Sequence, residues 1–342
     1  MRWSKVLHLV DAHCEGEAGR VVVGGFLGPP GETIAAKLAH LNAGDDAIRR
    51  LLCSEPRGAP AGSGILLPPS TRPEADTGFI VLQPDQSHAM SGSNAICATT
   101  VLLETGMVTM REPETKVVLD TAAGLVEAVA TCADGVCERV SLDMPPAYVD
   151  ALDVEIETKE WGPLRYDLCF GGVFYALVDV NQLGLRIEPG AARQLATIGV
   201  ALREQINAAR HVRHPRIPEI SGVAYVMFLD RGPDGALRTC TCMWPGRVDR
   251  SPCGTGTTAA VAALQARGQI KAGERVTSRS IINGEFEARL KAVNQVDGVV
   301  FSSVSVSGRA WIYGARQVGL DPRDPFPRGF TLSDVWGETS AE

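Results

Sequence analysis

The stretch Ser251-Pro252-Cys253-Gly254-Thr255-Gly256-Thr257-Thr258 decides how the rest of the chain is interpreted. It places a cysteine beside a Gly-Thr-Gly turn, just before an apolar segment, 259–266, that predicts a helix ending at Gly268. The first N–H groups of a helix have no acceptor within it, so they can bind an anion, and their positive potential favours a thiolate over a thiol. The stretch therefore predicts a reactive cysteine or, about equally well, a structural cysteine buried beside a glycine turn.

A second copy of the pattern lies 162 positions earlier, where Ser91-Gly92-Ser93-Asn94-Ala95-Ile96-Cys97-Ala98 leads into residues 99–105 and ends at Gly106. The same offset relates Ser91 to Cys253, Gly92 to Gly254 and Ser93 to Thr255. Chance similarity between two short Ala/Thr/Leu helices is the alternative. An internal duplication would give two similar halves, with two helix starts that together hold a carboxylate.

Length and composition predict a two-domain globular protein. The chain has 342 residues, of which 45% are hydrophobic and 21% charged. A net charge of −7 without a basic run argues against a nucleic-acid or anionic-membrane partner.

Cysteine usage and the chain start favour a cytoplasmic protein. The nine cysteines form no CxxC pair and show no zinc-ligand spacing, which favours reduced thiols and predicts no metal site. The start lacks the apolar core of a signal peptide, and no run of 18 apolar residues occurs.

Several segments elsewhere could contribute to a site. The polar stretch 11–20, with His13, Glu17 and Arg20, is predicted to be a loop between two strands, and 32–53 to be one helix. His211 and His214 are predicted on a loop with at most a modest role in a site. The run 167–179 predicts a buried strand in which Gly171-Gly172 marks the close approach of a ligand or another backbone.

These segments together resemble the proline racemase family. The resemblance is carried by Ser251–Thr257, Asp249, the sequence Met90-Ser91-Gly92-Ser93, the sequence 170–175 and the Asp11/His13/Glu17 opening, so it covers nearly the whole chain. It implies an α/β (mixed α+β) fold of the diaminopimelate epimerase type, with each of two pseudo-symmetric domains a curled mixed sheet around a central helix. The expected domains are 1–130 with about 312–342, and 131–311, with the active site in the cleft between them.

The resemblance also implies a mechanism without a cofactor. In the racemases two cysteines lie on opposite faces of the substrate α-carbon, one removing a proton and the other returning one. The corresponding catalytic residues here are Ser91 and Cys253. The substrate carboxylate is expected on the N–H groups of Gly92, Ser93, Gly254 and Thr255, and the ring nitrogen on Asp249.

The sequence departs from the racemase pattern at the first catalytic position, where Ser91 replaces cysteine and Ser93 replaces histidine. Because an unassisted hydroxyl is a much weaker acid than a thiol, symmetric two-base racemisation is not favoured. We therefore expect a lyase, trans-3-hydroxy-L-proline dehydratase, in which one group serves a same-face elimination that gives 1-pyrroline-2-carboxylate and water. The alternatives are an isomerase, either 4-hydroxyproline 2-epimerase or a proline racemase side activity, and a non-catalytic binding protein for cyclic amino acids. The expected partner is hydroxyproline itself, and a homodimer is left open.

Overall fold

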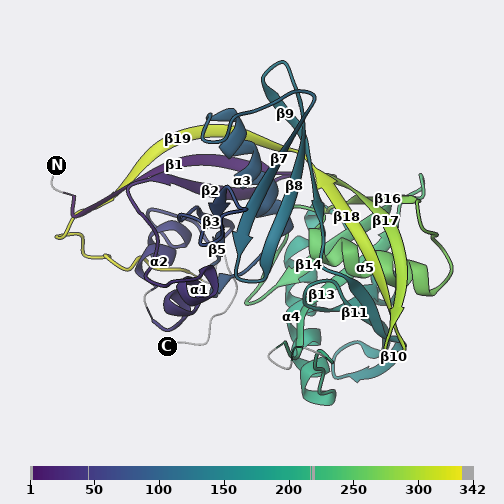
Figure 1. Ribbon diagram of the computed structural model, residues 1–342. Coiled ribbons are helices and arrows are strands. Elements are labelled where there is room, and N and C mark those ends of the chain that lie inside the picture. The colour runs from purple at the N-terminus through teal and green to yellow at the C-terminus, as the bar shows by residue number, and fades with distance from the viewer. Residues whose placement is uncertain (1–2, 45, 216, 218–219, 333–342) are drawn as a thin grey trace. The chain divides into compact units, whose positions relative to one another are not determined.

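The computed structural model describes residues 3–44, 46–215, 217 and 220–332, and it has a mixed α/β fold. The chain divides into two compact units (Figure 1). Unit 1 comprises Met1–Leu142 and Gly308–Glu342, and unit 2 comprises Asp143–Ser307. The predicted α/β fold is confirmed.

Unit 1 contains two groups of strands. In its described part, one sheet has the order β19-β1-β2-β3-β5-β6, and β4, β7, β8 and β9 pair in succession. The strands are β1 (Lys5–Cys14), β2 (Glu17–Gly24), β3 (Gly62–Leu66), β4 (Thr77–Gly78), β5 (Ile80–Leu82), β6 (Ser87–His88), β7 (Glu114–Thr121), β8 (Gly124–Ala133), β9 (Val136–Asp143) and β19 (Ala310–Leu320). Pairing of β1 with both β2 and β19 joins the two ends of the chain within this unit.

The polar stretch 11–20 is not the loop that the sequence predicted. It forms the facing ends of β1 and β2, which pair antiparallel up to Cys14 and Glu17. Only Glu15 and Gly16 turn, with φ of 48° and 94°, the positive values that a tight two-residue hairpin turn requires. A strand is recognised by alternating buried apolar and exposed polar residues. Asp11 and Glu17 break this alternation, because they are polar and yet buried.

The predicted helix over 32–53 is two helices, α1 (Ile34–Asn42) and α2 (Ala47–Cys53). Gly44 has a φ of 125°, which is incompatible with a continuing helix, so the chain breaks there. The buried residues Leu41, Ile48 and Leu52 nevertheless belong to one core cluster, which is why the apolar pattern gave a single continuous prediction.

Unit 2 is a sheet that closes on itself. Its strands follow the order β10-β11-β12-β13-β14-β16-β17-β18, and β10 also pairs with β18. They are β10 (Ala147–Thr158), β11 (Gly162–Phe170), β12 (Phe174–Asp179), β13 (Val223–Arg231), β14 (Leu237–Met243), β16 (Arg275–Arg279), β17 (Glu285–Val296) and β18 (Val299–Gly308), with the short β15 (Arg247–Val248) on β14. The remaining elements are η1 (Val180–Leu183), η2 (Pro189–Ala191), α4 (Ala192–Ala209) and α5 (Gly254–Ala266).

Residues 174–178 of strand β12 are buried because the strand is covered on both faces. Phe174, Ala176 and Val178 belong to the core that contains residues of α4. The alternate residues Tyr175 and Leu177 belong to the core formed with α5. Successive side chains of a strand point to opposite faces, so Tyr175 is directed toward the start of α5.

The two predicted helices are confirmed. α3 (Gly92–Glu104) and α5 (Gly254–Ala266) have 13 residues each. In unit 1, α3 packs against β1, β2, β3, β8 and β19, and in unit 2, α5 packs against β10, β11, β12 and β17 (Figure 1). Gly106 and Gly268 follow the helix ends with φ of 73° and 69°, the left-handed conformation that commonly ends a helix. Each unit is thus organised around a central helix.

Candidate active site

Cys253 stands immediately before α5 in an uncommon backbone conformation. Its φ is 66°, in the left-handed region that residues other than glycine seldom adopt. The preceding loop holds it there: the N–H of Cys253 donates to Ser251 Oγ at 3.2 Å, and the N–H and Oγ of Ser251 donate to Asp249 Oδ1 at 2.8 and 2.9 Å. Asp249 therefore fixes the loop that carries the cysteine. This structural role is additional to the contact with the substrate ring nitrogen that was expected from the sequence.

The thiol of Cys253 is buried against two hydroxyl groups. Tyr175 Oη lies 3.3 Å from Cys253 Sγ and 2.6 Å from Thr255 Oγ1. Burial and, second to it, the Asp249 carboxylate raise the pKa of the Cys253 thiol to about 11, although hydrogen bonds from Tyr175, Thr241 and the backbone of Gly256 act in the opposite direction. Burial also raises the pKa of Tyr175 well above its usual range, so this phenol is neutral.

Glycines allow the backbone to crowd this helix start. A Cβ on Gly171 would collide with the carbonyl oxygen of Thr255, and one on Gly256 would lie 3.2 Å from Cys253 Sγ. The double glycine was predicted to mark a close approach, and for Gly171 that prediction is confirmed, with the backbone of α5 as the neighbour.

Ser91 occupies the equivalent place before α3 with different geometry. Its φ is −154°, so the two helix starts are not copies of each other in backbone conformation. Asn94 Nδ2 donates to Ser91 Oγ at 2.9 Å and lies 3.3 Å from Ser63 Oγ, while Ser93 Oγ lies 3.4 Å from Ser91 Oγ. Asn94 and Ser63 are buried, which fixes the amide donor beside the hydroxyl.

The first N–H groups of α3 and α5 have no acceptor within their own helix. The first ladder bonds run from Ala95 N–H to Ser91 C=O and from Thr257 N–H to Cys253 C=O, at 2.9 and 2.8 Å. The N–H groups of 92–94 and of Gly254 and Thr255 therefore point toward the helix starts and suit an anion such as a carboxylate, while the N–H of Gly256 bonds to Cys253.

Two neighbours of the predicted residues, Tyr175 and Asn94, were not predicted as functional. Asn94 is three residues from Ser91, a spacing that faces the helix start and could have been a signal. Tyr175 is 78 positions from Cys253, and its signals were a hydroxyl between apolar strand residues and its place in the stretch 170–175 that carries the family resemblance.

The three histidines that the sequence analysis considered, His13, His211 and His214, lie in surroundings of three different kinds. His13 Nδ1 accepts from the N–H of Gly16 at 3.2 Å, and its ring stacks on Trp311. His214 is buried with its ring edge-on to Phe170, and His211 is exposed.

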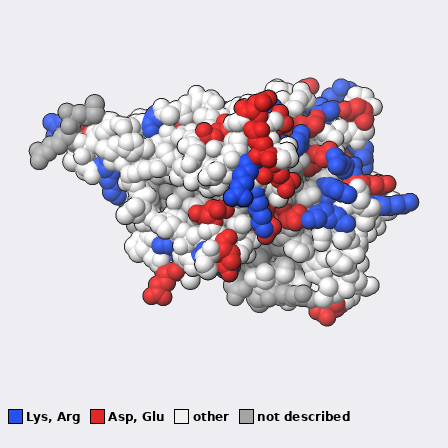
Figure 2. Space-filling model, turned by 45° about the horizontal axis from the view of Figure 1, so that its top comes forward, with Lys and Arg blue, Asp and Glu red and all other residues white. Residues whose placement is uncertain are grey.

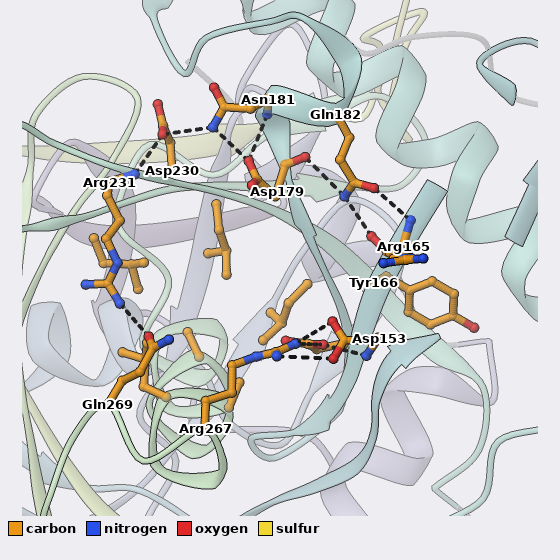
Figure 3. A pocket seen from close by; sticks show the side chains of 17 residues that line it. Asp153, Arg165, Tyr166, Asp179, Asn181, Gln182, Asp230, Arg231, Arg267 and Gln269 are labelled. Carbon is orange, nitrogen blue, oxygen red and sulfur yellow. Dashed lines mark hydrogen bonds and ion pairs between the residues drawn. The ribbon is translucent and has the colours of Figure 1, made fainter. Parts of the chain in front are cut away.

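A separate cavity of ≈ 640 Å³ in unit 2 lies by the C-terminal half of α5 (Figure 3). Its three arginines are already bonded to neighbours: Arg267 to Asp153 and Asp167, Arg231 to Gln269, and Arg165 to Glu155. Cys253 is not among the residues that line it. We therefore place the chemistry at the start of α5 and not in this cavity.

Within the described ranges, no group of three or more His, Cys, Asp or Glu side chains is arranged to hold a metal ion. No helix among the described residues is long and apolar enough to cross a membrane. All nine cysteines are described, and each is a buried free thiol.

Comparison with known proteins gives consistent results. The sequence profile of the family described as proline racemase matches residues 9–331. A protein of Rhizobium etli named 4-hydroxyproline 2-epimerase is 57% identical over 344 aligned residues, covering 100% of both chains. A crystal structure of a hydroxyproline epimerase from Agrobacterium vitis with bound trans-4-hydroxy-L-proline is 55% identical, covers 98% of each chain and superimposes with a TM-score of 0.91. A PhzF-family protein of Bacillus anthracis shares the fold at 11% identity, with a TM-score of 0.59 and coverage of 92% and 99%.

Proposed function

The chain belongs to the proline racemase family, and we propose that it is a 4-hydroxyproline 2-epimerase. The reaction inverts the α-carbon of trans-4-hydroxy-L-proline to give cis-4-hydroxy-D-proline, and runs in both directions. The observation that carries the proposal is the similarity, over 98% of both chains, to an epimerase structure that contains trans-4-hydroxy-L-proline.

The prediction of a lyase that dehydrates trans-3-hydroxy-L-proline is wrong. Relatives that are 55–57% identical over nearly the full chain are named 4-hydroxyproline 2-epimerase, so the isomerase alternative is the better one. The error came from treating Ser91 as an unassisted hydroxyl opposite a strongly acidic thiol. Asn94 donates to Ser91 Oγ, and burial raises the pKa of Cys253 to about 11, so the two groups are less unequal than their residue types suggest.

We propose that Cys253 and Ser91 act on opposite faces of the substrate α-carbon. The Cys253 thiolate takes the α-proton: the C–H bond breaks, an S–H bond forms, and the electron pair stays on the substrate as an enolate-like carbanion. The Ser91 hydroxyl then gives its proton to the other face, and exchange with water restores both groups. The reverse direction exchanges the two roles.

The remaining predicted residues are proposed to hold the substrate. N–H groups of Gly92, Ser93, Gly254 and Thr255 would bind the carboxylate and stabilise the charge that develops on it as the α-proton leaves. Asp249 would bind the ring ammonium, and this positive charge would offset the effect of the Asp249 carboxylate on the nearby thiol. A cytoplasmic location stays a prediction.

The test is incubation with trans-4-hydroxy-L-proline in D₂O. We expect the cis-D epimer, with deuterium at the α-carbon, to appear at a rate that greatly exceeds any loss of water from trans-3-hydroxy-L-proline. A binding protein without catalysis would exchange no α-hydrogen from either compound. Absence of the epimer together with dehydration of the 3-isomer would refute the proposal.

A further inference from the structure

Three buried or half-buried groups form a continuous chain of hydrogen-bonding contacts at the start of α5. Thr255 Oγ1 lies 2.6 Å from Tyr175 Oη, and Tyr175 Oη lies 3.3 Å from Cys253 Sγ. The direct contact between Cys253 Sγ and Thr255 Oγ1 is longer, at 3.8 Å. The phenol is thus the central member of the chain and makes the shorter contact with each of the other two groups.

Each hydroxyl in this chain can donate or accept, so the chain has two complete arrangements. Beside a thiolate, Thr255 donates to Tyr175, and Tyr175 donates to the sulfur. Beside a thiol, Cys253 donates to Tyr175, Tyr175 donates to Thr255, and the hydroxyl of half-buried Thr255 turns toward solvent. Only hydrogen positions change between the two arrangements.

We infer that Tyr175, supported by Thr255, is a positioning residue that reverses its hydrogen bond to Cys253 as the cysteine alternates between base and acid. The inference rests on the proposed function, because an epimerase that works in both directions needs the same sulfur in both protonation states. The backbone N–H of Gly256 can only donate to the sulfur and so favours the thiolate, whereas a partner that can also accept is needed beside the thiol. The amphoteric phenol serves both states.

Burial makes this contact effective. Tyr175 is completely buried, and Cys253 is 8% exposed, so little water competes for the sulfur and the hydrogen bond acts in a medium of low polarity. The phenol does not ionise in place of the thiol, since its pKa is raised well above the usual range. Strand β12 holds Tyr175 on the face that packs against α5.

The experiment measures the rate at which iodoacetamide alkylates Cys253 as a function of pH, followed by peptide mass spectrometry, in wild type and in Tyr175→Phe. Loss of the donor to the thiolate is expected to move the alkylation midpoint upward by about one pH unit, which lowers the rate at a fixed pH about tenfold. Thr255→Val is expected to move it in the same direction by less, and Thr255→Ser to restore the wild-type profile.

The matched control is Tyr148→Phe, which removes a buried phenol hydroxyl from the other core of unit 2. It is expected to leave the profile unchanged. Coinciding profiles for wild type, Tyr175→Phe and Thr255→Val would overturn the inference, as would an equal shift in Tyr148→Phe.

Turnover gives the second measurement. In Tyr175→Phe we expect kcat for epimerisation to fall about tenfold with KM nearly unchanged, whereas a purely structural role would leave the thiol titration in place. Because alkylation needs no substrate, a shifted profile in a protein that does not epimerise would support the hydrogen-bond chain and refute the proposed function. Normal epimerisation by Tyr175→Phe with an unshifted alkylation profile would support the proposed function and refute the hydrogen-bond chain.

Discussion

At the scale of single residues, Ser91 and Cys253 differ in both chemistry and backbone conformation. The sequence placed both at helix starts correctly, because glycine turns and apolar helices are local signals. It did not reveal that Asn94 donates to Ser91 or that Tyr175 contacts Cys253. The first contact depends on a rotamer, and the second on which face of a distant strand meets the helix, and neither is fixed by local sequence.

Ser91→Ala and Cys253→Ala test the proposed division of labour between the two residues. Each variant should lose inversion by at least about 100-fold, the usual contribution of a general acid or base. The remaining group can still remove a proton and return a deuteron on its own face, so each variant should exchange the α-hydrogen of one epimer with retention. The measurement is NMR of both epimers in D₂O. Exchange of the same epimer by both variants would show that the residues do not serve opposite faces.

Asp249→Asn separates the charge of the carboxylate from its loop contacts. The amide oxygen can still accept from Ser251, as Asp249 Oδ1 does. Removing a nearby negative charge lowers the pKa of Cys253 from its value of about 11, so the thiolate fraction near pH 8 increases and alkylation becomes faster. Turnover should fall by roughly 10- to 150-fold, because a hydrogen bond to a charged ring nitrogen contributes about 1.5–3 kcal/mol. Slower or unchanged alkylation would contradict this account.

At the scale of elements, the helices with a regular apolar pattern were predicted correctly, whereas the short turns were missed. α3 and α5 were predicted because each has an apolar run that ends at a glycine. The hairpin of β1 and β2 was missed because its turn is only Glu15 and Gly16, and the break between α1 and α2 because apolar periodicity continues through it. In both places one or two positive φ values decide the structure without altering the surrounding pattern.

Gly171→Ala tests how closely the loop after β11 packs on α5. The added Cβ would collide with the backbone of Thr255, and a backbone atom cannot move aside as a side chain can. We expect the free energy of unfolding to fall by about 1–3 kcal/mol and turnover to fall with it, because the shift displaces Thr255.

Gly190→Ala is the matched control, because nothing lies within 4 Å of the added Cβ there. It should leave the free energy of unfolding within about 0.5 kcal/mol of wild type. Chemical denaturation followed by circular dichroism measures both variants. Equal stability of Gly171→Ala and wild type would show that the close approach is readily relaxed.

At the scale of the whole molecule, acidic and basic side chains commonly lie side by side. On the face shown in Figure 2, acidic and basic side chains lie among one another, and many form pairs such as Arg275 with Glu287 and Arg267 with Asp167. Motifs spread along the chain were sufficient to predict the fold and the family. They were insufficient for the reaction, because the acid–base behaviour of Ser91 and Cys253 depends on neighbours such as Asn94 and Tyr175, which the residue types alone do not specify.

Unit 1 is assembled from both ends of the chain, and its last described segment is fastened by Arg57. Its guanidinium donates to Asp324 Oδ2 at 2.5 Å and to the carbonyl oxygens of Phe326 and Pro327 at 2.6 and 3.2 Å. Nearby, the N–H groups of Glu55 and Phe330 each donate to the other residue's carbonyl at 2.9 Å. The Arg57 side chain is only 11% exposed, so these bonds are little weakened by water.

Arg57→Ala should therefore release the segment around Asp324 and reduce the free energy of unfolding by about 1–3 kcal/mol, because it removes charge-assisted hydrogen bonds from a mostly buried side chain. Hydrogen–deuterium exchange should become faster at the amides of Glu55 and Phe330. Arg323→Ala is the matched control: its side chain is 83% exposed and pairs only locally with Asp321, so it should change neither quantity measurably. Equal effects of the two substitutions would mean that Arg57 does not hold the returning segment on unit 1.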